Sequence, residues 1–93
     1  MWGYWILSIT WADSSAKHGI PRDEALYAVA HAELFVESFG QPRGGDHTPS
    51  LFIGPSRFGT LEVLAVVTPP REIWVFHVMP LRESTARAAG YVR

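Results

Sequence analysis

The chain has 93 residues and a formal net charge of −1, and this length predicts a single domain, residues 1–93, with a modest core. Its composition is 47% hydrophobic, 13% aromatic and 18% charged, which excludes a disordered chain. The absence of cysteine excludes disulfides, cysteine-based zinc sites and thiol catalysis, and it fits a reducing cytoplasm. The apolar stretch 2–11 is too short for a membrane span, so we expect a cytoplasmic protein that does not enter the membrane.

The two halves of the chain differ in charge. Residues 1–46 carry three Lys/Arg against six Asp/Glu, whereas residues 47–93 carry five arginines against three glutamates. Arginine offers a planar fork that matches phosphate geometry, so the second half is the more suitable for a polyanion. Ordinary solvated arginines explain this weak asymmetry equally well, and the overall negative charge by itself disfavours a nucleic-acid binder.

Aromatic and β-branched residues dominate the first predicted element, a strand over 4–11. An aspartate and two serines, natural N-cap residues, follow it and predict a short helix over 14–18. A second helix over 21–32 begins at a proline, which is favoured at a first helical position, and its apolar residues recur at helical spacing. The segment 34–39 is then predicted to form the next strand.

The second half predicts a meander of strands. A loop over 40–49, rich in glycine and proline, precedes three short strands over 50–54, 60–68 and 73–79. Short connections between successive strands make hairpins, so these strands are expected to be antiparallel. A polar helix over 82–90 follows the last strand.

In order, these elements form a β-α-α-β-β-β-β-α pattern, which predicts an α+β fold. We expect N-terminal helices packed on a mainly antiparallel sheet of four or five strands, with a short C-terminal helix. The helix over 21–32 should lie on one face of that sheet. Val66 and Val75 lie at the centres of two apolar strands, so both should be buried.

Lys17 and His18 are adjacent at the predicted corner between the two N-terminal helices. An ammonium group beside an imidazole can bind a phosphate and transfer a proton. Cations are also common at the C-terminal ends of helices, where they interact with free carbonyl groups, and this is the more frequent role.

Arg57 lies in the hairpin loop Gly-Pro-Ser-Arg-Phe-Gly over 54–59. Two glycines and a proline constrain this loop, so its arginine is expected to be presented to solvent at one end of the sheet. A charged residue at a hairpin tip often serves only solubility.

His77 interrupts an otherwise apolar strand, and Arg82 follows soon after that strand ends. A buried histidine must be hydrogen-bonded, and a satisfied core or edge histidine is the more frequent case. If the strand end and the hairpin loop converge, His77, Arg82 and Arg57 can surround one anion. RNA cleavage requires a base for the 2′-hydroxyl, an acid for the leaving oxygen and positive charge for the phosphorane. RNA supplies its own nucleophile, so no serine or cysteine is needed.

The sequence predicts neither a metal site nor a cofactor site. Its four histidines show no paired ligand spacing, and it contains no glycine-rich phosphate loop and no Gly-x-Ser-x-Gly motif. We therefore expect the chain to act without a metal and without a cofactor.

The run at 13–25, Asp-Ser-Ser-Ala-Lys-His-Gly-Ile-Pro-Arg-Asp-Glu-Ala, resembles the D…KHG(I/V)…EA signature of BrnT-type toxins of bacterial toxin–antitoxin systems. The later segment is similar to that family's Arg-x-(Ser/Thr)…Tyr ending, with Arg82, Ser84 and Tyr91 in register. The resemblance extends over about residues 12–91.

This resemblance implies a RelE-like fold, cleavage of mRNA that is either ribosome-independent or ribosome-linked, and neutralisation by a cognate antitoxin. It implies substrate-binding or catalytic roles for four residues: Lys17, His18, Arg57 and Arg82. Together with the strand histidine, the candidate catalytic residues are His77, Arg82 and His18, and the candidate substrate-binding residues are Lys17 and Arg57.

Two functions are therefore open. The first is an endoribonuclease toxin of a type II toxin–antitoxin pair, with RNA and a cognate antitoxin as partners. The alternative is a non-catalytic protein-interaction module on the same fold, in which the aromatic strand within 2–11 extends a partner's sheet or forms a dimer face. A homodimer or a hetero-oligomer with the antitoxin is the expected assembly. No motif supports a small-molecule-binding domain.

Overall fold

The computed structural model describes residues 8–40, 48–68 and 72–92. Residues 4–7 of the predicted first strand, most of the predicted loop over 40–49 and the turn at 69–70 lie outside the described residues. The elements in chain order are β1 (Ser8–Trp11), the 3-10 helix η2 (Asp13–Ala16), α1 (Arg22–Ala30), β2 (Leu34–Val36), β3 (Ser50–Gly54), β4 (Leu61–Thr68), β5 (Glu72–Pro80) and α2 (Glu83–Ala89).

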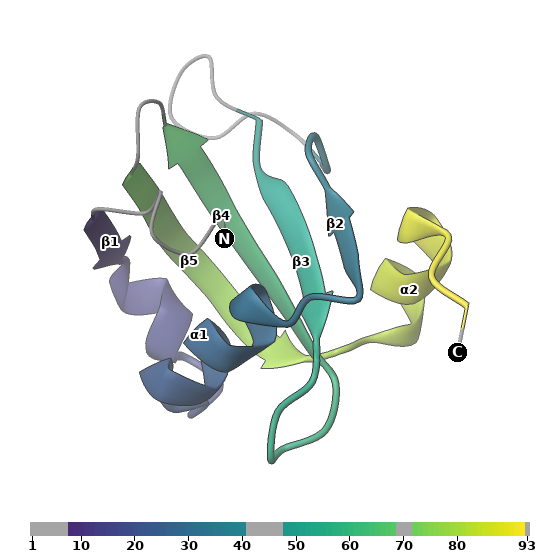
Figure 1. The fold of residues 1–93 in the computed structure, drawn as a ribbon, viewed down its shortest axis with the longest axis horizontal. Coiled ribbons are helices and arrows are strands. Elements are labelled where there is room, and N and C mark those ends of the chain that lie inside the picture. Colours follow the sequence, from purple (N-terminus) through teal and green to yellow (C-terminus); the bar gives the residue numbers. More distant parts are fainter. Residues whose placement is uncertain (1–7, 41–47, 69–71, 93) are drawn as a thin grey trace.

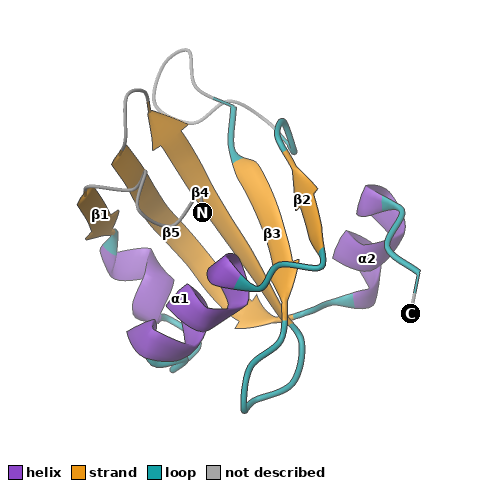
Figure 2. Cartoon of the chain, viewed as in Figure 1, coloured by secondary structure: helices purple, strands orange, loops and turns teal. Residues whose placement is uncertain are grey.

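The strands form one five-stranded sheet in the order β1-β5-β4-β3-β2, with helices as separate elements around it (Figures 1 and 2). The predicted α+β class is therefore confirmed. From β2 to β5 each neighbouring pair is antiparallel, as the short connections predicted. The sheet is nevertheless mixed, because β1 pairs with β5 in parallel. That pairing joins segments more than 60 residues apart, so no turn motif in the sequence predicts it.

Several elements are shorter than predicted, among them α1, which ends at Ala30 and not at residue 32. The expected helix over 14–18 is a single 3-10 turn at Asp13–Ala16, and the expected strand over 34–39 ends at Val36. The first segment closes with i→i+3 bonds, because the N–H groups of Lys17 and Gly19 donate to the carbonyls of Ser14 and Ala16, and Gly19 (φ 72°) then turns the chain. Pro21 itself is extended (φ −61°, ψ 147°) and caps α1, which begins one residue later than predicted.

α1 packs across one face of the sheet, over β3 and β4. Its buried residues Ala25, Ala28 and Val29 join the core cluster with side chains from all three central strands. The helix backbone comes so close that a Cβ on Gly54 of β3 would lie 2.0 Å from the carbonyl oxygen of Ala28. Only glycine allows this approach, so Gly54 fixes where α1 crosses the sheet.

The central strands are buried, as predicted from their apolar pattern. Val66 in β4 is 6% exposed and Val75 in β5 is 2% exposed, which confirms both expectations. The residues that follow α2 are joined to those that precede β2, because the hydroxyl of Tyr91 donates to Oε1 of Glu33 at 2.6 Å. Among the described residues, no helix combines the length and apolar character needed to cross a membrane.

Candidate active site

A buried carboxylate organises the candidate site. Glu62 lies in β4 between Leu61 and Val63, which both face α1, so its side chain points to the opposite face of the sheet. It is fully buried, with 0% of the residue exposed. Arg82 donates to this carboxylate three times, from its backbone N–H at 2.9 Å, from Nη2 at 2.7 Å and from Nε at 3.1 Å. Thr85 of α2 adds a side-chain hydrogen bond.

The same carboxylate holds the imidazole of His77. Nε2 of His77 lies 2.8 Å from Oε2 of Glu62. An ionised carboxylate only accepts hydrogen bonds, so Nε2 carries a proton and donates it. In the neutral ring this arrangement leaves Nδ1 with a free lone pair, which can take up a proton. The buried carboxylate orients the ring of His77, and the side chain is still 21% exposed to solvent.

A β-bulge turns His77 toward Glu62. His77 pairs with Leu64 and Val75 pairs with Ala65, so the register shifts here and Phe76 is the extra residue of β5. Without this extra residue, His77 would alternate in phase with Val75 and point into the α1 core. The bulge carbonyl of Phe76 is satisfied by the hydroxyl of Ser14, which donates at 2.6 Å. The 3-10 helix thus stabilises the irregularity that places the imidazole.

The contacts of Glu62 determine its ionisation. Burial alone raises the pKa of a carboxyl group, but hydrogen bonds from His77, Arg82 and Thr85 outweigh burial and lower the pKa of Glu62 to about 2. In return, the hydrogen bond to Glu62 raises the pKa of Arg82. At neutral pH the pair is therefore a carboxylate and a guanidinium, and 49% of the Arg82 side chain remains exposed to a second anion.

His18 meets His77 from another element. Its ring lies 5.9 Å from that of His77, centroid to centroid, with an interplanar angle of 75°. Gly19, with a φ of 72°, adopts the left-handed conformation that ends the 3-10 segment and turns the chain at His18. His18 and Lys17 are both exposed in this corner. The structure thus brings three sequence-predicted residues together, His18, His77 and Arg82, with Lys17 next to the first of them.

Arg57 lies apart from this group, unlike the expectation that it would share an anion with His77 and Arg82. Its backbone N–H donates to Oε1 of Glu24 at 2.8 Å, and its Nε donates to Oε2 of the same residue. Nη2 of Arg57 also lies 3.9 Å from Asp23. The two arginines belong to opposite faces of the sheet: Arg57 is bound to the first turn of α1, whereas Arg82 is bound to Glu62. The backbone N–H and side chain of Arg57 lower the pKa of Glu24.

Glu62 is the residue that the sequence-based site prediction missed. The available signal was its place as the lone carboxylate in the apolar strand Leu61–Thr68. A buried charge needs a partner, so an isolated glutamate in a core strand indicates that cations lie beside it. The strand alone does not identify these partners, because the position of His77 depends on the bulge and that of Arg82 depends on the path of the chain after β5.

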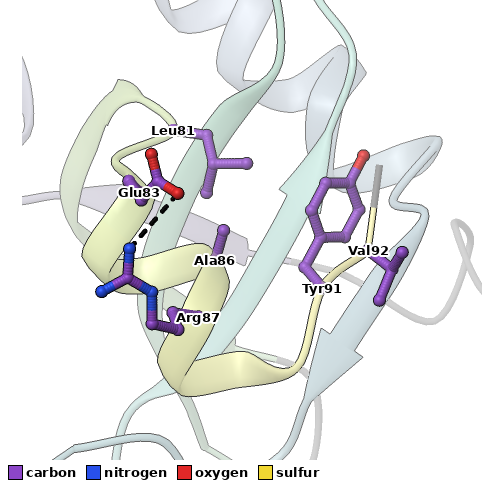
Figure 3. Close-up of a pocket in the computed structure, with 6 residues that line it drawn as sticks. All are labelled: Leu81, Glu83, Ala86, Arg87, Tyr91 and Val92. Atoms are coloured by element: carbon purple, nitrogen blue, oxygen red, sulfur yellow. Dashed lines mark ion pairs between the residues drawn. The ribbon is translucent and has the colours of Figure 1, made fainter.

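A surface cleft lies on α2 and the residues that follow it, outside the imidazole pair. It is lined by Leu81, Glu83, Ala86, Arg87, Tyr91 and Val92. In Figure 3 the ion pair between Arg87 Nη2 and Glu83, 3.3 Å apart, borders one side, and Tyr91 and Val92 border the other. Both charged side chains are more than three-quarters exposed, and the residues that line the cleft do not include His18, His77 or Arg82.

Within the described ranges, no three His, Asp or Glu side chains cluster closely enough to hold a metal ion. The groups that the site presents are two imidazoles, one of them oriented by a carboxylate, and an exposed guanidinium. Comparison of the chain with models of protein families, with curated proteins and with solved structures found no match.

Proposed function

We propose that the chain is an endoribonuclease that cleaves RNA by general acid–base chemistry, and that it acts as the toxin of a type II toxin–antitoxin pair. The observation that carries the first part is the ring-to-ring contact of His18 and His77 at 5.9 Å, beside the half-exposed guanidinium of Arg82. The second part follows from the resemblance of residues 13–25 to BrnT-type toxins. That resemblance also motivates the RelE-like fold and the cognate antitoxin as parts of the proposal.

Each group has a role in this proposal. Cleavage of RNA begins when a base takes the proton of the 2′-hydroxyl, whose oxygen attacks the adjacent phosphorus, and it ends when an acid protonates the leaving 5′-oxygen. One imidazole serves as the base and the other as the acid, and Glu62 keeps the His77 ring in one orientation. Arg82 stabilises the charge of the phosphorane, for which a guanidinium fork is suited. Lys17, exposed next to His18, holds a neighbouring phosphate.

Arg57 has no part in this mechanism. Its side chain is 75% exposed, but its Nε is occupied by Glu24 and its Nη2 lies near Asp23. These carboxylates offset its positive charge, so the site on the opposite face gains little from it.

The test is induced expression in a bacterial host, in which growth, transcript integrity and the thermal stability of each purified variant are measured. Wild type should arrest growth and cleave transcripts. His77→Gln retains an amide donor for Glu62 but cannot transfer a proton, and His18→Ala removes an exposed ring. Both variants should stay folded and lose cleavage. His31→Ala is the matched control, because His31 is exposed at the end of α1, where it contacts Tyr27.

The outcomes distinguish a wrong assignment of a residue from a wrong function. If a folded His77→Gln protein still cleaves RNA, His77 is not part of the mechanism. A wild-type protein that neither arrests growth nor cleaves RNA contradicts the endoribonuclease and favours a non-catalytic interaction module. The observation behind that second candidate is the exposed apolar surface of α1, where Leu26 is 39% and Tyr27 is 51% exposed.

A further inference from the structure

An exposed indole lies on the same face of the sheet as the candidate site. Trp74 in β5 pairs directly with Val66 in β4, and Val66 alternates in phase with Glu62. The side chains of Trp74 and Glu62 therefore project from the same face, opposite α1. Trp74 is 38% exposed, although its strand is paired on both sides at this point, with β1 and with β4.

Phe76 supports this indole. The rings of Trp74 and Phe76 lie 5.3 Å apart at 31°, and Phe76 is only 4% exposed. One part of the indole is thus packed against a buried ring, and 38% of the residue is exposed to solvent. Because the contact restricts the indole, a flat ligand can stack on it without ordering a mobile side chain first.

The bulge brings this aromatic pair next to the imidazole. Phe76 is the bulged residue and His77 follows it immediately. Along a strand, the three residues from Trp74 to His77 span at most about 10 Å. A nucleic-acid chain whose phosphate lies at His77 and Arg82 therefore has a neighbouring base within reach of Trp74.

We propose that Trp74 is a stacking subsite for one base of single-stranded RNA, beside the phosphate at His77 and Arg82. The inference rests on the proposed function. An aromatic side chain on a sheet face takes up an unstacked base, so the substrate is single-stranded. Stacking accepts any base, because every base has a π face, so the subsite adds affinity without strong sequence preference. Cationic side chains alone would bind the phosphate backbone of the RNA and would leave its bases without a contact.

The test measures binding of a short oligonucleotide with 2′-O-methyl groups, which cannot be cleaved. A second set of oligonucleotides carries one abasic residue, placed at each position in turn. Trp74→Leu should weaken binding of the intact oligonucleotide by about tenfold. One abasic position should weaken wild type by a similar factor and should leave Trp74→Leu almost unaffected. Phe35→Leu is the matched control: Phe35 is also an exposed strand aromatic, but it contacts Phe52 on the α1 face.

A measurement on the wild-type protein covers the case in which Trp74→Leu fails to fold. The indole N–H signal of Trp74, assigned by its loss in Trp74→Phe, should shift when the intact oligonucleotide is added. It should not shift with the oligonucleotide that lacks the stacked base. One outcome refutes the subsite and leaves the proposed function standing. In it, the oligonucleotide binds and replacement of Arg82 weakens this binding, but the Trp74 signal does not shift and Trp74→Leu binds as tightly as wild type. If wild type binds no oligonucleotide, both are refuted.

Discussion

Replacement of Glu62 by glutamine tests the energetic centre of the site. Glutamine keeps the shape of the side chain and removes its charge. The carboxylate is fully buried and receives hydrogen bonds from His77, Arg82 and Thr85. Because these contacts favour the ionised form, the variant should lose the part of folding stability that depends on this charge.

The expected magnitude follows from the pKa. The contacts lower the pKa of Glu62 from an ordinary 4.5 to about 2, which corresponds to at most about 3 kcal/mol at neutral pH. Arg82 is 49% exposed, and solvent screening on that side reduces the expected loss to about 2 kcal/mol. A group whose pKa is lowered by folding stabilises the protein above its unfolded pKa and loses that effect as the pH falls. The difference between wild type and Glu62→Gln should therefore shrink by more than half between about pH 6 and about pH 3.

Urea unfolding of both proteins across this pH range measures the difference. Glu83→Gln provides the matched control, because Glu83 forms an exposed i,i+4 ion pair with Arg87 that is worth less than about 0.5 kcal/mol. A loss below about 1 kcal/mol in Glu62→Gln, with the same pH dependence as wild type, would show that this carboxylate does not hold the site together.

Three further predictions concern the core and the two arginines. Val75→Ala should lower the free energy of unfolding by about 1–3 kcal/mol in urea titration, since Val75 is 2% exposed in the core; a loss within error would contradict its packing. Gly54→Ala should cost about 2–3 kcal/mol in the same assay, because the new Cβ must displace the backbone of Ala28, and a neutral effect would mean that α1 does not cross there. Arg82→Gln should reduce the slope of log affinity for RNA against log salt by about one charge, whereas Arg57→Gln should leave it unchanged; equal effects of both would contradict their placement on opposite faces.

Much of the fold was predictable because its information is local. Apolar runs separated by glycine and proline marked β3, β4, β5 and the start of α2 to within one or two residues. The parallel pairing of β1 with β5 was not predictable, because it depends on contacts between distant segments. The 3-10 turn was predicted as a longer helix, since capping residues indicate where a helix begins and not how far it continues.

The site was only partly predictable for a related reason. Residue types and spacing pointed to His18, His77 and Arg82, and the structure brings these together. Glu62, the common partner of His77 and Arg82, was missed, because strand alternation alone would direct His77 into the α1 core and away from this carboxylate. The bulge at Phe76 reverses that direction, and single residues inserted into a strand leave little trace in a hydrophobic pattern. Arg57 was expected in the site, but Glu24, a residue of another element, binds it instead.

The most direct test of the proposed function uses purified protein and a defined RNA. The mechanism requires the 2′-hydroxyl as nucleophile, so the products should carry a 2′,3′-cyclic phosphate and a free 5′-hydroxyl. A single 2′-deoxy substitution at the cleaved position should abolish cleavage there. End-group analysis by mass spectrometry of the products from both RNAs gives the answer. Absence of cleavage in the unmodified RNA, or continued cleavage at the 2′-deoxy position, would contradict an acid–base ribonuclease built on His18, His77 and Arg82.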